Sequence, residues 1–135
     1  MAYQFRKHRF DKSRRLKTPA QFKLVYDNKQ WGNTRLLTFN AMYDPSLGDG
    51  ISRLGVTVSK KVSKLAVRRN QLKRLVREFY RHHHQELEKT NLVVTVKPAA
   101  KTVSNAEFNK DLLELWEKLM KWQRWHTRKL NSVDR

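Results

Sequence analysis

The chain of 135 residues contains no cysteine, only four glycines and only 12 acidic residues. Without cysteine it can form neither disulfides nor thiolate metal sites, so nothing in it indicates an oxidising compartment. The few glycines leave no Gly-rich loop of the kind that cradles nucleotide phosphates. No apolar run reaches bilayer-spanning length, and the basic N-terminus lacks the apolar stretch of a signal peptide. We therefore expect a cytoplasmic protein that does not enter a membrane.

Basic residues are abundant: 30 Lys and Arg give the chain a formal net charge of +18. Such an excess repels itself unless a polyanion neutralises it, and nucleic acid is the commonest cytoplasmic polyanion. An anionic membrane surface is the weaker alternative. The length predicts one domain over residues 1–135, with a flexible basic arm over residues 1–17 and a basic tail over residues 123–135 that frays.

Local patterns predict a mixed α and β fold. Thr18-Pro19-Ala20-Gln21 is a capping box that begins a helix, and Phe22, Val25 and Tyr26 share one face of it. Alternating residues predict strands over 37–43 and 54–59, and the turn residues between them predict a hairpin.

Two further elements follow towards the C-terminus. The β-branched run over residues 92–96 predicts a buried strand, so that the sheet has four strands or fewer. A second capping box over residues 104–107 begins a long amphipathic helix, whose apolar residues recur every three or four positions as far as Trp122. We expect Trp116, Trp122 and Trp125 to pack against the sheet, with no part in binding.

A basic helix over residues 65–81 is the most distinctive segment. From Lys60 to Arg81 the chain has nine Lys or Arg and one Glu. A helical wheel places the apolar residues on one arc and the basic ones on the other, where like charges lower helix stability. Phosphates would relieve that repulsion, and arginine suits their geometry, so the pattern indicates RNA or DNA binding. An ordinary solvated helix face is the alternative.

Catalytic chemistry has no clear candidate in this sequence. His82, His83 and His84 are consecutive, so on a helix their side chains point in three directions and cannot ligate one ion together. The acidic residues form no obvious convergent pair for two-metal hydrolysis. We predict no catalytic residue and no metal ligand. Four aromatic residues fit either base stacking or ordinary core packing, and the sequence leaves both open: Phe22, Tyr26, Phe39 and Tyr43.

Three blocks in order resemble the bacterial ribonuclease P protein component. They are RLKTPAQF over residues 15–22, RLGVTVSKK over 53–61 and RNQLKRLVREF over 69–79. The resemblance spans roughly residues 14–120. It implies an α+β fold: a two-layer α/β sandwich with a central sheet of about four strands, three helices and a left-handed βαβ crossover that contains the basic helix.

The resemblance also implies a function. The protein subunit of ribonuclease P binds the catalytic RNA and the 5′ leader of precursor tRNA, and assists removal of the leader in tRNA 5′ maturation. The hydrolytic chemistry and most of the bound Mg²⁺ belong to the RNA. Two alternatives remain: a structural or ribosomal RNA-binding protein without a processing role, and a self-sufficient nuclease.

Site residues are implied by the same resemblance. Those that contact the RNA subunit are Arg69, Asn70, Lys73, Arg74 and Arg77, and those that contact the leader are Phe22, Tyr26, Lys60 and Lys61. Two departures stand out. Gln71 occupies a place where the family usually has arginine, and we expect Arg68 to replace that contact. Asn40 aligns with an aromatic residue of some relatives.

Overall fold

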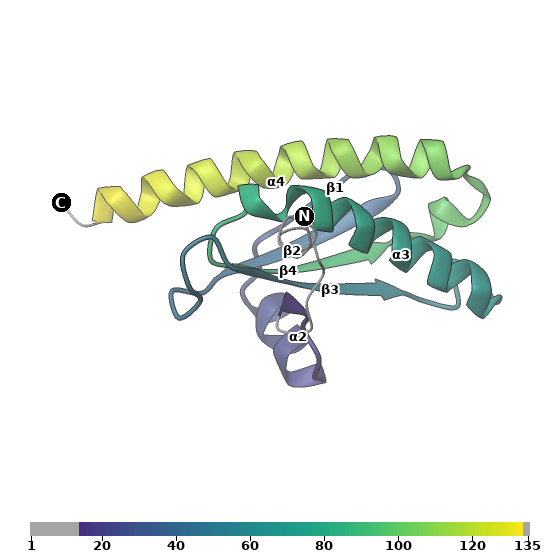
Figure 1. Ribbon diagram of the computed structural model, residues 1–135, viewed down its shortest axis with the longest axis horizontal. Helices are drawn as coiled ribbons and strands as arrows, with labels where there is room; N and C mark the ends of the chain where they lie inside the picture. The colour runs from purple at the N-terminus through teal and green to yellow at the C-terminus, as the bar shows by residue number, and fades with distance from the viewer. Residues whose placement is uncertain (1–13, 134–135) are drawn as a thin grey trace, which may run out of the picture.

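A mixed four-stranded sheet with helices on both faces makes up the computed structural model, which describes residues 14–133 (Figure 1). The elements in chain order are α2 (Pro19–Asp27), β1 (Trp31–Asn33), β2 (Leu37–Tyr43), β3 (Ser52–Val58), α3 (Ala66–His83), β4 (Thr90–Val96) and α4 (Asn105–Val133), with short 3₁₀ helices η2 (His84–Glu86) and η3 (Pro98–Thr102). The predicted α+β class is confirmed.

The strand order is β1-β2-β4-β3, with β4 antiparallel to β2 and parallel to β3. The predicted hairpin between β2 and β3 is therefore wrong, because β4 lies between them. All but one of the residues of β4 are buried, and an apolar strand of this kind is stabilised best in the middle of a sheet, with neighbours on both sides. The alternation of residues within β2 and β3 predicts which face of the sheet each side chain occupies, but it does not predict which strands are neighbours.

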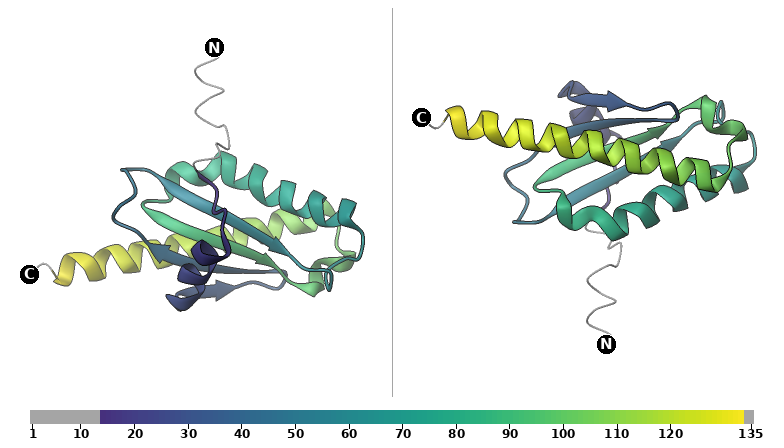
Figure 2. Two further views of the ribbon diagram at one scale, coloured as in Figure 1. Left: turned by 90° about the horizontal axis from the view of Figure 1, so that it is seen from below. Right: turned by 90° about the horizontal axis from the view of Figure 1, so that it is seen from above.

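The connection from β3 through α3 to β4 has the rare left-handed sense. Figure 2 (left) shows the sheet with α3 behind it: the chain runs rightwards in β3, returns through α3, and runs rightwards again in β4, displaced downwards. Nearly all βαβ units turn the other way. The handedness implied by the resemblance is confirmed.

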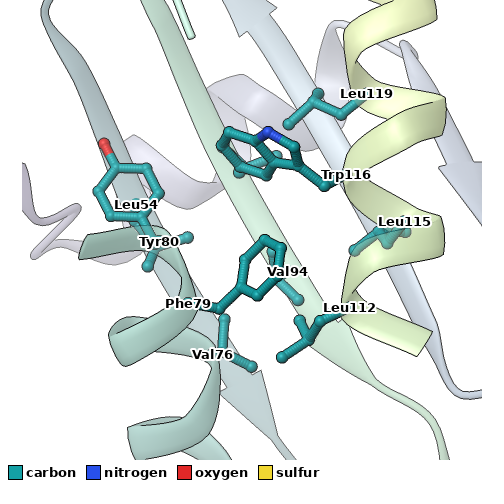
Figure 3. A pocket seen from close by; sticks show the side chains of 10 residues that line it. Leu54, Val76, Phe79, Tyr80, Val94, Leu112, Leu115, Trp116 and Leu119 are labelled. Carbon is teal, nitrogen blue, oxygen red and sulfur yellow. The ribbon is translucent and has the colours of Figure 1, made fainter. Parts of the chain in front are cut away.

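The main core lies between the sheet and the layer formed by α3 and α4 (Figure 3). Phe79 of α3 meets Trp116 of α4 edge-on at 5.8 Å between ring centroids, and both lie over Leu54 and Val94 of the sheet. Tyr80 is also buried, and its hydroxyl shares a hydrogen bond with Ser52. Burial raises the pKa of Tyr80 to about 12, so the hydroxyl stays protonated at neutral pH.

Helix α2 occupies the opposite face of the sheet (Figure 2). Its predicted capping box is confirmed: the Gln21 backbone N–H donates to the Thr18 hydroxyl, and the Gln21 carboxamide oxygen accepts from the Thr18 backbone. Phe22 lies over Gly55 of β3, and Val25 packs with Val93 of β4. The helix thus covers part of this face and leaves the rest open.

A buried carboxylate holds the β1–β2 connection in place. Asp111 of α4 accepts from the Thr34 hydroxyl and from the Leu36 backbone N–H, the latter at 3.2 Å. Buried acceptors are retained where several donors satisfy them. Strand β1 was not predicted, because its three residues, one of them glycine, show no alternation.

The C-terminal segment continues α4 as a regular helix to Val133, so the prediction that the chain frays from Gln123 is wrong. Contacts made by Trp122 and His126 explain the difference. The Trp122 indole N–H donates to the Gln30 carboxamide oxygen at 3.0 Å, and the His126 ring lies 5.2 Å from the rings of both Trp122 and Tyr43. Composition alone does not reveal such anchors.

Of the predicted basic arm over residues 1–17, the structure describes only residues 14–17. Residues 1–13 lie outside the described part of the chain. Arg15 forms a parallel bridge with Leu54, and the Leu16 backbone N–H donates to the Leu54 carbonyl at 3.0 Å. Leu16 is buried beneath α2, so residues 14–17 belong to the folded domain and not to a flexible arm.

Candidate nucleic-acid interface

The outward side of α3 and the segment before α2 enclose a basic hollow, called the α3 surface below. Its lining comes from about three turns of α3 and from the N-terminal segment: Arg15, Asn70, Arg74, Arg77, Glu78 and Arg81. The bridge between Arg15 and Leu54 fixes the N-terminal side of the hollow. Residues four apart on α3 supply the other side, because they lie on one helix face.

Charge in the α3 surface is strongly positive. Glu78 accepts from Arg81 and lies 3.3 Å from His82, and the hydrogen bond from Arg81 lowers the pKa of its carboxyl group. Burial and the nearby positive charge of Arg15 lower the pKa of Arg77. A guanidinium nevertheless keeps its charge at neutral pH. The arrangement suits a ligand with closely spaced negative charges, such as a phosphate backbone.

Two other predicted RNA contacts lie beside the hollow. Arg69 donates from Nη1 to the Ser63 carbonyl at 2.8 Å, so it ties the loop after β3 to the start of α3. Lys73 is half-buried and lies one residue before Arg74. Of the predicted set, the structure gathers Asn70, Arg74 and Arg77 around one hollow.

Arg68 points away from that hollow. Its guanidinium donates to the Val103 carbonyl at 3.0 Å, to the Asn105 side chain at 2.9 Å and to Gln71 Oε1 at 3.0 Å. These bonds join α3 to the start of α4. Gln71 therefore helps to orient an arginine used within the fold, and this geometry does not favour Arg68 as the replacement for a lost RNA contact.

The open part of the other sheet face carries three threonines in a row across β2, β4 and β3. Thr38 pairs with Thr95, Thr95 pairs with Thr57, and the Thr57 and Thr95 hydroxyls are 3.0 Å apart. Directly paired residues point to the same side of a sheet. Trp31 pairs in the same way with Asn40, and its side chain is 62% exposed. We call Trp31, Thr38, Asn40, Thr57 and Thr95 the open face.

The predicted leader-binding residues lie on α2 and in the turn that follows β3. Phe22 is half-buried, and a Cβ at Gly55 would come within 2.5 Å of its ring, so the ring rests directly on the β3 backbone. Tyr26 is 40% exposed. Lys60 and Lys61 are exposed in the turn that follows β3. Phe39, in contrast, is buried in the main core.

Residues 14–133 contain no cluster of metal ligands: no group of three His, Asp or Glu side chains there could hold an ion. The three adjacent histidines are separated in space. His83 stacks on Phe79 with 3.9 Å between ring centroids, His84 is buried, and His82 is exposed beside Glu78.

A protein-family model described as "Ribonuclease P" matches residues 10–120, which is most of the chain. The chain belongs to the ribonuclease P protein family. Among curated relatives, the ribonuclease P protein component of Pseudoalteromonas atlantica is 39% identical over 83% of this chain and 91% of that protein. The component from Stutzerimonas stutzeri is 36% identical over 82% of each chain.

Solved ribonuclease P proteins have the same fold. The Staphylococcus aureus protein superposes with a TM-score of 0.74 at 25% identity, covering 80% of this chain and 96% of that one. The Thermotoga maritima protein gives 0.65 at 26% identity, covering 75% and 93%. In both cases, part of this chain has no counterpart in the solved structure.

Membership of the ribonuclease P protein family identifies the chain as the protein subunit of ribonuclease P, with a role in tRNA 5′ processing alongside an RNA subunit. Ribonuclease P is a metal-dependent ribonucleoprotein. No helix within residues 14–133 combines the length and the apolar character needed to cross a bilayer.

Several surface residues were missed by the sequence reasoning. Arg15 was assigned to a flexible arm, and Trp31 lies on a strand that was not predicted. The prediction that Trp125 packs against the sheet is wrong, since its side chain is 46% exposed. A helical wheel extended past Trp122 places Trp125 away from the apolar stripe, but the predicted fraying from Gln123 leaves no helix there to which a wheel applies.

Proposed function

We propose that this subunit binds the catalytic RNA through its α3 surface and the 5′ leader of precursor tRNA across its open face, as one ribonuclease P protein domain acting in the cytoplasm. The observation that carries the proposal is the convergence of Arg15, Arg74, Arg77 and Arg81 on one hollow. The positive charges of these four arginines repel one another and raise the free energy of the unbound protein. Bound phosphates would relieve this repulsion.

The leader contacts are proposed on a separate face. Phe22 offers an aromatic ring over Gly55 of β3, Tyr26 offers an exposed ring one helical turn further along α2, and Lys60 and Lys61 add positive charge at the end of β3. A single strand stacks its bases on aromatic rings and places its phosphates near cations. Trp31 extends this face at the position opposite Asn40, and so supplies an aromatic ring where that strand position has none.

Mg²⁺ is proposed to be the metal of the assembled enzyme and to be held mainly by the RNA. The described residues offer no cluster that fits it. What this chain contributes is positive charge near the phosphates, which lowers their mutual repulsion and helps the RNA to retain its ions.

The α3 surface is tested with Lys73→Glu combined with Arg74→Glu. The matched control reverses two exposed lysines elsewhere, Lys101→Glu with Lys110→Glu, and has the same net charge. We expect the α3 variant to bind the catalytic RNA roughly 100-fold more weakly than the control, with a shallower dependence of affinity on salt. Folded α3 variants with the affinity of the control would contradict the docking surface.

The leader surface is tested with Tyr26→Ala, which removes an exposed ring at little cost to folding. Leu24→Ala is the control, because Leu24 lies on the same helix and is 59% exposed. Tyr26→Ala should weaken precursor tRNA binding by roughly 10-fold and leave mature tRNA binding unchanged, since only the precursor carries a leader. Equal losses for the two RNAs would exclude a leader contact here.

Cleavage assays separate the alternative functions. Precursor tRNA and Mg²⁺ are incubated with the protein, with and without the catalytic RNA. We expect the protein to increase the rate of precursor tRNA cleavage only when the catalytic RNA is present. Cleavage by protein alone would support a self-sufficient nuclease, and an unchanged RNA-dependent rate would support a structural RNA-binding protein.

A further inference from the structure

Residues 121–129 of α4 differ in charge from the part of the helix that precedes them. Residues 105–120 contain four acidic and two basic side chains, whereas residues 121–129 contain four basic and no acidic ones. The family model ends at residue 120, where this change occurs. The C-terminal end of α4 also projects beyond the end of the strands (Figures 1 and 2).

The basic side chains share one side of the helix. At 100° per residue they fall within an arc of about 140°, opposite the buried stripe that contains Leu112, Leu115 and Leu119. Trp125 lies within the same arc. We call this set the α4 extension: Lys121, Arg124, Trp125, Arg128 and Lys129, all of them exposed.

Two side chains anchor the extension to the rest of the domain. Trp122 and His126 project from the other side of the helix, where they contact Gln30 and Tyr43. Burial, and then the charge of Lys129, lower the pKa of His126, so this anchor is neutral at pH 7 and its contacts are aromatic. A fixed helix presents its cations at defined positions, about 12 Å from Lys121 to Lys129.

Helix stability does not explain these charges. Cations stabilise a helix through its dipole only within about the last turn, whereas this cluster begins twelve residues before the end of α4 at Val133. Arg124 and Arg128 are four residues apart, so their charges repel each other and lower helix stability. Trp125 is exposed, and the Lys129 Nζ lies 4.9 Å from its ring centroid. A neutral aromatic ring does not stabilise a helix through its dipole, so this residue is not explained by helix stability either.

We propose that the α4 extension is a second docking surface for the catalytic RNA, in which its cations contact backbone phosphates and Trp125 provides a plane for an unpaired base. This rests on the proposed function. The catalytic RNA is favoured over the leader because α4 lies in the same layer as α3, whereas α2 and the open face lie on the other side of the sheet (Figure 2).

The test removes three charges of the extension: Lys121→Gln, Arg124→Gln and Arg128→Gln. The control removes three charges from exposed residues outside the extension, Arg35→Gln, Lys101→Gln and Lys110→Gln, so that both proteins have equal net charge. Glutamine is a good helix former, and circular dichroism with urea unfolding checks that α4 is intact. A third variant, Lys121→Arg, Arg124→Lys and Arg128→Lys, keeps the charges.

Affinity for the catalytic RNA alone is measured over a series of salt concentrations. The neutralised extension should bind roughly 10-fold more weakly than the control, with a log–log salt slope shallower by about 2, while the charge-keeping variant binds as the parent protein does. Neutralised protein that matches the control would overturn the proposal. A loss that appears only with precursor tRNA would also overturn it, by placing the extension on the substrate.

The result is separable from the proposed function. If Lys73→Glu with Arg74→Glu abolishes RNA binding and the neutralised extension does not weaken it, the α3 surface stands and the extension alone is refuted. If neither set of changes weakens binding, both the α3 surface and the α4 extension are refuted as docking surfaces for the catalytic RNA.

Discussion

The two faces of the sheet differ in how completely they are covered. On one face, α3 and α4 bury large apolar side chains such as Phe108 and Leu119 almost fully. On the other face, α2 crosses only part of the strands and leaves a row of threonines accessible. Apolar burial is the main source of folding free energy, so stability is concentrated on the first face. The second face is free to carry exposed groups for binding.

Phe108→Ala should have the largest effect on stability, because Phe108 is fully buried between α4 and the sheet. Replacement of a buried phenylalanine by alanine costs about 3–5 kcal/mol, from lost transfer free energy and the cavity left behind. The urea unfolding midpoint measures this cost. A loss below about 1 kcal/mol would show that stability is not concentrated on this face.

Gly55→Ala should have an intermediate effect on the other face. The new Cβ would lie 2.5 Å from the nearest atom of the Phe22 ring and 2.8 Å from the next, so the ring must move off β3. Overpacking costs about 1–3 kcal/mol, partly offset by the lower backbone entropy of alanine in the unfolded chain. Unfolding experiments should show a net loss of about 1 kcal/mol, and precursor tRNA binding should weaken as Phe22 moves. Unchanged precursor affinity would separate Phe22 from the leader surface.

Arg68→Met should destabilise the protein by about 1 kcal/mol, because it removes hydrogen bonds to Val103 and Asn105 while keeping the apolar stem. Affinity for the catalytic RNA, measured at one salt concentration beside Lys73→Gln, should fall less for Arg68→Met than for the lysine variant. The opposite ranking would return Arg68 to the RNA-contacting set.

Trp31→Ala should have the smallest effect on stability, within about 0.5 kcal/mol, since the side chain is 62% exposed on an edge strand. Its effect on precursor tRNA binding should be larger, about 1–3 kcal/mol if a base stacks on the ring. Unfolding curves and binding to precursor and mature tRNA are measured on one preparation. A stability loss above 1 kcal/mol without a binding change would show that the ring is structural.

Much of this architecture could be predicted from the sequence. The bounds of β2 and the cap of α2 follow from alternation and from Thr18 and Gln21, because both depend on neighbouring residues. The order of the strands could not be predicted in the same way. Local patterns do not specify which strands pair, and the left-handed crossover came only from the family resemblance.

Site prediction had a similar limit. Patterning identified the basic side of α3, but it could not show that Arg68 is turned towards Val103 or that Arg15 completes the hollow, because both depend on distant segments. The α4 extension could not be predicted from polar composition, which indicates fraying, because the contacts that hold the helix are those of Trp122 with Gln30 and of His126 with Tyr43.

The bridge between Arg15 and Leu54 has a consequence for solubility. An unpaired strand edge is a template for aggregation with other chains. Here β3 lies at one edge, where the Leu16 backbone bond to Leu54 occupies part of its free hydrogen-bonding groups, and the opposite edge strand, β1, is only three residues long. The segment that lines the basic hollow therefore also protects the β3 edge from pairing with other chains. Its truncation should promote aggregation, and it should also weaken assembly if the hollow binds RNA as proposed.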